Sequence, residues 1–151
     1  MIEFHKATTE EIEKLMSIRL EMLRIVNDLP DNFEFDSTFK DYSRDYFLNG
    51  EQTTVLALDN GNAIGCASIS YIKIMPTFDH PTGKRAHLMN VYTNNSYRRQ
   101  GIGKKMVELL IEEAREKGCT EISLDATSVG RFLYTWLGFT QNKEGMVLNL
   151  K

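Results

Sequence analysis

The sequence contains little of what marks several protein classes. Among its 151 residues are 2 cysteines, 3 prolines and 1 tryptophan, too few for a disulfide scaffold or a proline-rich chain. Cys66 and Cys119 lie in no metal-ligand or redox spacing, so we expect two reduced thiols and no metal site. No run approaches the roughly 20 apolar residues of a membrane span, and Met1–Thr9 is unlike a signal peptide. We therefore expect a cytoplasmic protein without membrane contact.

Acidic residues are missing from one long stretch of the chain. The whole sequence has 18 basic and 21 acidic residues, a net charge of −3, which argues against a dedicated nucleic-acid binder. From His80 to Val107, however, there is no Asp or Glu. The basic residues in this stretch are Lys84, Arg85, Arg98, Arg99, Lys104 and Lys105. This contrast predicts a small anionic partner rather than a nucleic acid.

The hydrophobic pattern predicts strands alternating with helices in one domain that covers residues 1–151. Strands are expected at Met1–Ala7, Thr53–Leu58, Ala63–Ile74, Ala86–Thr93 and Glu121–Ala126, with a final pair at Thr140–Asn142 and Met146–Leu150. Helices are expected after the capping residues Thr8 and Glu11, at Ser37–Leu48, from Gly103 to Lys117, and at Gly130–Leu137. Strand, helix and strand between residues 86 and 126 form a βαβ unit, whose right-handed crossover makes the two strands parallel. The fold class is therefore α/β or α+β.

Side-chain spacing in the C-terminal half predicts two sets of contacts. Glu113 and Lys117 lie four residues apart on one predicted helix, so their charges are expected to pair. Apolar residues in and after the last predicted helix are expected to join the core. These residues are Phe132, Leu133, Trp136, Leu137 and Phe139.

A basic loop with two glycines joins the strand Ala86–Thr93 to the helix that follows it. The loop reads Arg98-Arg99-Gln100-Gly101-Ile102-Gly103-Lys104-Lys105. Glycines let the backbone approach a ligand closely, and the free N–H groups of a first helical turn attract anions. A dinucleotide fingerprint requires glycine where Met106 stands, and a P-loop requires glycine where Arg98 stands. Both nucleotide motifs fail, and the loop fits the pattern Arg-x-x-Gly-x-Gly instead.

The segment Asn90–Phe139 resembles the core of the GNAT superfamily of N-acetyltransferases. The matching pieces are the strand Asn90–Thr93, the loop Arg98–Gly103, the helix to Lys117, the strand Ile122–Ala126 and the ending Leu133-Tyr134-Thr135-Trp136-Leu137-Gly138-Phe139. The order of the preceding elements is also similar to that family. The resemblance implies a mixed, mostly antiparallel sheet flanked by helices. It further implies an acetyl-CoA-dependent enzyme that acetylates a primary amine of a small molecule or protein by direct attack in a ternary complex.

The resemblance also implies the residues of an acetyl-CoA site. The cofactor-binding positions so implied are Val91, Tyr92, Thr93, Arg98, Arg99, Gln100, Gly101, Ile102, Gly103, Lys104 and Thr127. The loop amides would hold the pyrophosphate, and the strand backbone would hold the pantetheine arm and the thioester carbonyl. Tyr134 matches the family's usual general acid, which protonates or hydrogen-bonds the departing thiolate. Thr127 and Gly130 stand where many relatives have Asn and Ala.

The general base is harder to place from the sequence. The strand Ala86–Thr93 contains no carboxylate, although some relatives use a Glu there. His87 is the nearest titratable residue on that strand, and histidine is a common general base, so it is our candidate. Glu34, Asp31 and Asp125 are weaker alternatives.

Two loops are expected to bound the amine acceptor. Asn27–Asp36 is acidic and would attract a cationic amine, and Pro76–Arg85 forms an apolar lip that could contact the acceptor or the second subunit of a homodimer. The residues do not separate a polyamine, an aminoglycoside, an amino acid or a protein amine. An alternative of another class is a non-catalytic module of the same fold that senses CoA or acyl-CoA. A nucleotide-binding regulatory protein is disfavoured by the failed motifs.

Overall fold

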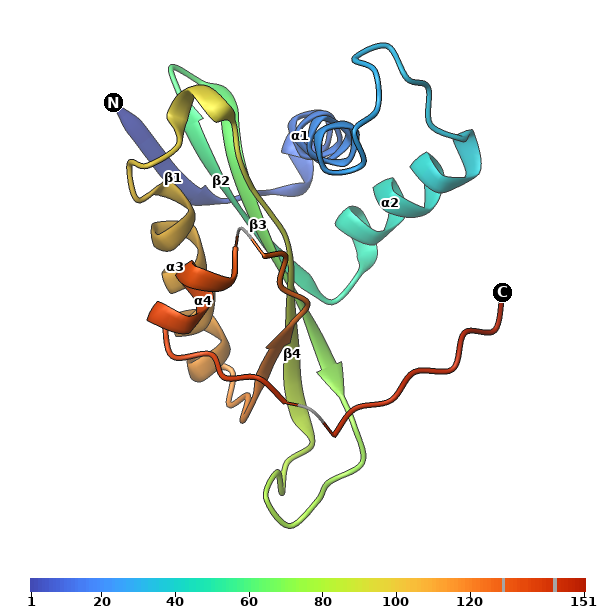
Figure 1. Ribbon diagram of the computed structural model, residues 1–151, viewed down its shortest axis with the longest axis vertical. Coiled ribbons are helices and arrows are strands. Elements are labelled where there is room, and N and C mark those ends of the chain that lie inside the picture. The colour runs from blue at the N-terminus through green and yellow to red at the C-terminus, as the bar shows by residue number, and fades with distance from the viewer. Residues whose placement is uncertain (129, 143) are drawn as a thin grey trace.

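A five-stranded sheet, whose strands follow the chain order, forms the centre of the computed structural model (Figure 1). The structure describes residues 1–128, 130–142 and 144–151. The strands are β1 (Ile2–Lys6), β2 (Gln52–Asp59), β3 (Asn62–Lys73), β4 (Lys84–Thr93) and β5 (Ile122–Leu124). The first four pair antiparallel, and β5 pairs parallel to β4. The predicted mixed, mostly antiparallel sheet is confirmed.

Helices cover both faces of this sheet (Figure 1). They are α1 (Ile12–Val26), α2 (Ser37–Asn49), α3 (Ile102–Glu116) and α4 (Arg131–Trp136), with short 3-10 turns η1 (Thr9–Glu11) and η2 (Asn95–Tyr97). The predicted cap before α1 forms, because the Thr8 amide donates a hydrogen bond of 3.0 Å to the Glu11 carboxylate. None of the helices in the described ranges is long and apolar enough to cross a membrane.

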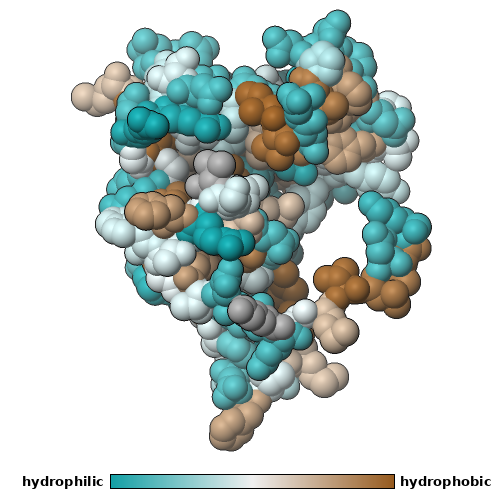
Figure 2. Space-filling model, in the orientation of Figure 1, coloured by the Kyte–Doolittle hydropathy of each residue, from teal (hydrophilic) through white to brown (hydrophobic). Residues whose placement is uncertain are grey.

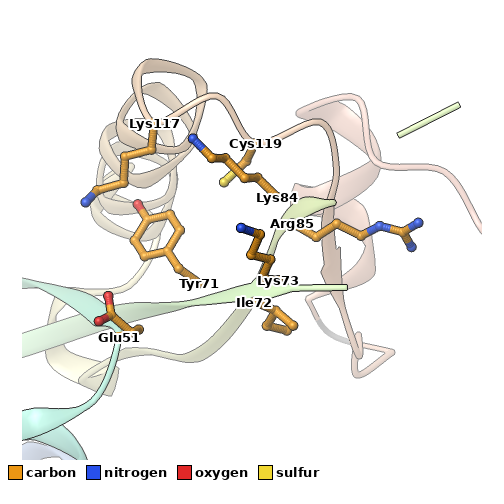
Figure 3. Close-up of a pocket in the computed structure, with 8 residues that line it drawn as sticks. All are labelled: Glu51, Tyr71, Ile72, Lys73, Lys84, Arg85, Lys117 and Cys119. Atoms are coloured by element: carbon orange, nitrogen blue, oxygen red, sulfur yellow. The ribbon is translucent and has the colours of Figure 1, made fainter. Parts of the chain in front are cut away.

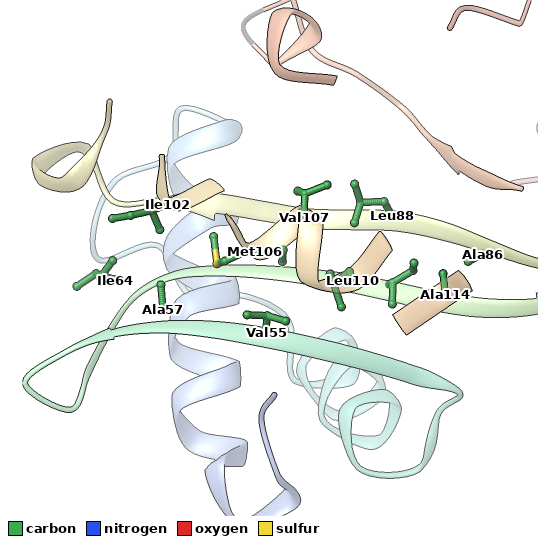
Figure 4. Packing of buried hydrophobic residues seen from close by; sticks show 12 residues of the cluster. Val55, Ala57, Ile64, Ala86, Leu88, Ile102, Met106, Val107, Leu110 and Ala114 are labelled. Carbon is green, nitrogen blue, oxygen red and sulfur yellow. The ribbon is translucent and has the colours of Figure 1, made fainter. Parts of the chain in front are cut away.

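Alternating side chains of the sheet build one apolar layer on each face. Val55 and Ala57 of β2 face α3, whereas Leu56 and Leu58 face α1. The α3 side of the core is packed by residues one helical turn apart: Met106, Val107, Leu110 and Ala114 (Figure 4). Burying one such large side chain contributes about 1.5–3 kcal/mol. The two layers hold β4 from both sides and fix its position.

Glu113 corrects the predicted pair with Lys117. It lies on the buried face of α3, where its carboxylate is 2.8 Å from the Lys6 ammonium and accepts a hydrogen bond from the Tyr71 hydroxyl. The Lys117 ammonium instead lies over the Tyr71 ring, 4.9 Å from its centroid. The predicted pair is wrong because Glu113 points at the sheet, where a buried carboxylate needs partners from β1 and β3.

Glu113→Gln is expected to lower the free energy of unfolding by about 1–3 kcal/mol at pH 7, because a charged hydrogen-bond partner is lost. Burial raises the pKa of Glu113, but hydrogen bonds from Lys6 and Tyr71 outweigh burial and leave that pKa lowered. The carboxylate therefore stabilises the fold above the ordinary glutamate pKa, and this contribution disappears as the pH falls through the lowered one. Urea unfolding at pH 7 and pH 3.5 measures the effect; an equal deficit at both pH values would contradict it.

The predicted final strand pair, Thr140–Asn142 and Met146–Leu150, is wrong. The described residues after α4 adopt no regular structure, and the C-terminal segment stands away from the body of the molecule (Figure 2). Met146 and Val147 are both 96% exposed and Leu150 is 90% exposed. The alternation of these residues suits a strand, but a strand needs a neighbour. The edge strand β5 ends at Leu124, so its described part offers no partner of that length.

The last helix packs on one side only, which corrects part of the predicted core. Leu133, Leu137 and Phe139 are half-buried, and Leu137 and Phe139 pack against the α3 layer as expected. Phe132 and Trp136, on the other side of α4, are 83% and 63% exposed. A helix of six residues offers one narrow face to the core, so its remaining apolar side chains stay outside.

Candidate functional site

Strands β4 and β5 pair only briefly and then part. Their register runs from Ala86 opposite Ile122 to Leu88 opposite Leu124, where β5 ends. The rest of β4, to Thr93, has β3 on one side and no described strand on the other. Such an edge offers backbone N–H and C=O groups to an extended ligand.

A bulge lies in β4 at the start of this open edge. Between Cys66 and Ser68 the ladder is interrupted, so that Ala67 faces two residues, Asn90 and Val91. Asn90 has a φ of 59°, a left-handed conformation that asparagine tolerates better than most residues. The extra residue reverses the alternation of the strand beyond it.

The bulge lets β4 serve both faces of the sheet. Before it, Leu88 packs toward α3; after it, Val91 packs toward α3 and Tyr92 toward α1. Asn90 itself is buried on the α1 side, where it accepts a hydrogen bond of 3.0 Å from Arg19 and donates one of 3.1 Å to Ser68. One short segment thus meets two different surfaces.

The predicted anion-binding loop leads into the N-terminus of α3. Gly101, with a φ of 76°, is the residue before the helix, and Arg99 has a φ of 64°. Within the described parts of the chain, the backbone amides of residues 99–104 donate to no acceptor. Unpaired amides at a helix start, together with the helix dipole, form a site for an anion.

Gly103 brings three parts of the predicted motif together. A Cβ atom on this residue would lie 3.8 Å from the Thr93 hydroxyl oxygen and 3.8 Å from a methyl group of Leu133. The end of β4, the start of α3 and α4 therefore converge at the loop. These segments match the family motif in their order along the sequence, and in the structure they also lie next to one another.

The basic stretch of the sequence is divided in space between the two ends of β4. Arg98 and Arg99 are exposed beside the loop, and the Lys104 ammonium lies 4.5 Å from the Trp136 ring centroid. Lys84 and Arg85 lie at the other end of β4, a strand of 10 residues that spans about 30 Å at a rise of about 3.3 Å per residue.

Those two residues border a separate hollow of about 360 Å³ at the far end of α3 (Figure 3). Its lining is Glu51, Tyr71, Ile72, Lys73, Lys84, Arg85, Lys117 and Cys119. Only four of the six basic residues of the stretch therefore remain near the glycine loop: Arg98, Arg99, Lys104 and Lys105.

Tyr134 is held on α4 by local turn chemistry. The Thr127 hydroxyl accepts a hydrogen bond of 3.2 Å from the Gly130 amide, which turns the chain into the helix. A Cβ atom on Gly130 would lie 3.1 Å from the Tyr134 ring, so glycine leaves room for this ring. The ring packs edge-to-face on Phe139 with centroids 5.8 Å apart. Burial raises the pKa of Tyr134, so the phenol keeps its proton at neutral pH.

His87 lies on the other side of the sheet from Tyr134. Its Nδ1 is 2.8 Å from the Ser123 hydroxyl, and its Nε2 is 3.8 Å from the exposed Asp125 carboxylate. Ala86 and Leu88 face α3, so by alternation His87 faces the α1 and α2 side, whereas Tyr134 packs on the α3 layer. The structure therefore does not gather the two predicted catalytic residues into one cluster; they lie on opposite sides of β4.

A hollow of about 340 Å³ opens on the α1 and α2 side, beside the bulge. It is lined by Arg19, Phe39, Tyr42, Ser43, Tyr46, Phe47, Gln52, Ser68, Ser70, Met89 and Asn90. The lining comes from α1, α2 and the sheet, and the loops Asn27–Asp36 and Pro76–Arg85, which were predicted to bound the acceptor, contribute no residue to it. Helix α2 packs beside α1, and its aromatic side chains line the hollow together with strand residues.

Arg19 and Asn90 are two residues of this hollow that were not predicted from the sequence as site residues. The signal for Arg19 is its position within the apolar stripe of α1, four residues after Leu15 and three before Met22, both of which are buried. A charged residue at such a position needs a special partner. Asn90 gave no comparable signal, because its conformation depends on a bulge that the apolar pattern of β4 conceals.

The order of elements and the glycine loop before α3 agree with the N-acetyltransferase family that the sequence resembles. A family model described as acetyltransferase (GNAT) family matches residues 17–139. The chain belongs to this family, which confirms the resemblance drawn from the sequence. Its relatives of known name are N-acetyltransferases, and one similar solved structure contains acetyl-CoA.

Relatives of known name or structure support this assignment. Glucosamine 6-phosphate N-acetyltransferase of Trypanosoma brucei brucei is 33% identical over 90 residues, which cover 60% of this chain and 59% of that protein. The enzyme of the same name from Arabidopsis thaliana is 25% identical over 107 residues, which cover 71% and 69% of the two chains. This chain thus matches less than two thirds of the trypanosomal protein.

A solved structure is similar over nearly the whole chain. The crystal structure of a predicted acetyltransferase from Clostridium acetobutylicum with acetyl-CoA is 31% identical and has a TM-score of 0.86. The match covers 99% of this chain and 96% of that chain. Among the residues that the structure describes here, no group of three or more His, Cys, Asp or Glu side chains could hold a metal ion.

Proposed function

We propose that this protein acetylates a primary amine by direct attack on the thioester of acetyl-CoA in a ternary complex, with residues 1–151 acting as one domain. The observation that carries the proposal is the edge of β4 that stays unpaired beyond the end of β5. The unpaired amides of residues 99–104 follow this edge at the start of α3, and Tyr134 packs against the layer on the α3 side of the sheet. On the other side of β4 lies the hollow beside Met89 and Asn90. The two substrates can therefore meet across one strand.

The residues present fit coenzyme A. The amides from Arg99 to Lys104 would hold the pyrophosphate, and the side chains of Arg98 and Arg99 would supply positive charge to the phosphates. The backbone of Val91–Thr93, on the open edge, would pair with the amides of the pantetheine arm. Thr127 would border the arm from the start of α4.

The chemistry assigned to the chain's own residues is proton transfer and charge stabilisation. When bound, acetyl-CoA supplies an activated acyl group as a thioester. As the amine nitrogen bonds to the carbonyl carbon and the carbon–sulfur bond breaks, the Tyr134 hydroxyl donates a proton to the sulfur. A backbone amide near Val91 stabilises negative charge on the carbonyl oxygen. His87, held by Ser123, accepts the amine proton through water.

An amine panel tests this proposal. Purified protein is incubated with acetyl-CoA and glucosamine 6-phosphate, an aminoglycoside, a polyamine, free lysine or a lysine peptide. We expect thiol release and an acetylated product, detected by mass spectrometry, with at least one amine. Tight acetyl-CoA binding without turnover of any amine would favour the non-catalytic sensing module instead.

A further inference from the structure

Arg19 is a partly buried cation that borders the hollow beside the bulge. It projects from the apolar face of α1, and its Nη1 donates a hydrogen bond of 3.0 Å to the side-chain oxygen of Asn90. Burial lowers the pKa of Arg19, which means that its environment disfavours the positive charge. A guanidinium carries five N–H donors, so this one hydrogen bond leaves most of its capacity unused.

No negative charge compensates Arg19 in the described parts of the chain. It forms no ion pair with a described carboxylate, and none of the described residues that line the hollow is acidic. Glu21, two residues further along α1, accepts hydrogen bonds from Tyr92 and Asn94 instead. The nearby Cys66 thiol stays protonated at neutral pH, because burial raises its pKa to about 12.

A partly desolvated cation without a counter-charge is stabilised by a ligand that supplies that charge. Arginine is also the side chain whose planar donors match a carboxylate or a phosphate. Four aromatic side chains of α2 line another part of the hollow and suit the flat or apolar body of a small molecule: Phe39, Tyr42, Tyr46 and Phe47. The rest of the lining is mostly polar and uncharged, so Arg19 is the one charged residue among the described lining residues.

We propose that the amine acceptor of this enzyme also carries an anionic group, a carboxylate or a phosphate, and that Arg19 binds this group in the hollow beside Asn90. The inference rests on the proposed function. It adds an anionic group to the cationic amine that the acidic loop Asn27–Asp36 was expected to attract. Because Asn90 adjoins Val91, an anion at Arg19 would place the acceptor next to the open edge of β4.

The test compares matched acceptors on wild type and Arg19→Gln. The phosphate pair is glucosamine 6-phosphate and glucosamine; the carboxylate pair is an amino acid and its amide. For at least one of these pairs, we expect the wild-type protein to have a kcat/KM at least tenfold higher for the anionic acceptor than for its neutral partner. Arg19→Gln should lower kcat/KM for that member about 10- to 100-fold, mainly through KM, and for its neutral partner less than threefold. Arg19→Lys should restore part of the loss.

Lys14→Gln is the matched control, since it removes the same charge from an exposed position on α1. It should leave kcat/KM unchanged for both the anionic and the neutral acceptor of each pair. Acetyl-CoA affinity, measured by calorimetry, reports whether each variant is folded. An equal loss for anionic and neutral acceptors in Arg19→Gln would mean that Arg19 only supports the fold, and it would overturn the inference.

Calorimetric binding of the same acceptor pairs in the presence of CoA separates the two proposals. Arg19-dependent binding of an anionic amine without turnover would support the anion site and contradict the proposed catalysis. Acetylation with no preference for the anionic acceptor, in either binding or rate, would support the proposed catalysis and contradict the anion site at Arg19.

Discussion

Gly103→Asp is expected to abolish acetyl-CoA binding and to leave the protein folded. The substitution places a carboxylate at the first turn of α3, where the phosphates are proposed to lie, and like charges repel strongly at such short range. Folding should not suffer, because an acidic side chain at a helix N-terminus interacts favourably with the helix dipole. Calorimetric titration with acetyl-CoA measures the loss, and the thermal midpoint shows that the fold is kept.

Gly103→Ala is the matched control for this prediction. The added Cβ would meet Thr93 and Leu133 at 3.8 Å, an ordinary contact, so affinity should change only a few-fold. Wild-type affinity in Gly103→Asp would place the phosphates elsewhere. A loss in Gly103→Ala as large as in Gly103→Asp would show that space, not charge, decides binding at this position.

Tyr134→Phe is expected to lower kcat at least tenfold while acetyl-CoA affinity stays unchanged. The variant removes the proton donor proposed for the leaving thiolate and keeps the ring that packs on Phe139. In the described part of the chain, the Tyr134 hydroxyl has no hydrogen-bond partner, so its removal should cost little stability. Steady-state kinetics with the best acceptor of the panel, together with acetyl-CoA titration, give both quantities.

Tyr97→Phe is a suitable comparison, because it removes a hydroxyl that donates only to Asp59, 2.6 Å away. Its turnover should stay within about threefold of wild type. The raised pKa of Tyr134 adds a condition: below the ordinary phenol pKa of about 10, ionisation of this residue should not reduce wild-type kcat. Wild-type kcat in Tyr134→Phe would remove the proposed role.

The parts of the site that could be predicted from sequence are those encoded locally. Gly101 and Gly103 mark the loop, and Thr127 with Gly130 turns the chain into α4, so short motifs suffice to find them. The βαβ unit follows from chain order and handedness. The glycines and basic residues of the loop predict only that an anion binds there. The family resemblance was needed to predict that this anion is acetyl-CoA.

The parts that could not be predicted depend on contacts between distant segments. Arg19 and Asn90 are 71 residues apart. Arg19 interrupts an apolar stripe, but its partner cannot be identified until α1 packs on β4. The apolar pattern of the C-terminal residues predicted a pair of strands. A strand must also pair with the free edge of another strand, and the pattern of one segment does not show whether such an edge exists. The basic residues at 84–85 and 98–99 are close in sequence, yet an extended strand separates them.

The bulge at Asn90 belongs to both of the proposed binding surfaces. The Asn90 side chain holds Arg19 beside the hollow proposed for the acceptor, while the Asn90 backbone lies where the edge proposed for the cofactor begins. A left-handed φ restricts this position largely to Asn, Asp or Gly. The two binding surfaces are thus tied to one residue with few acceptable replacements. Mutations that adapt the protein to a new acceptor are therefore expected in α1 and α2. Strand β4, which lies between the two proposed substrate sites, has little freedom to vary.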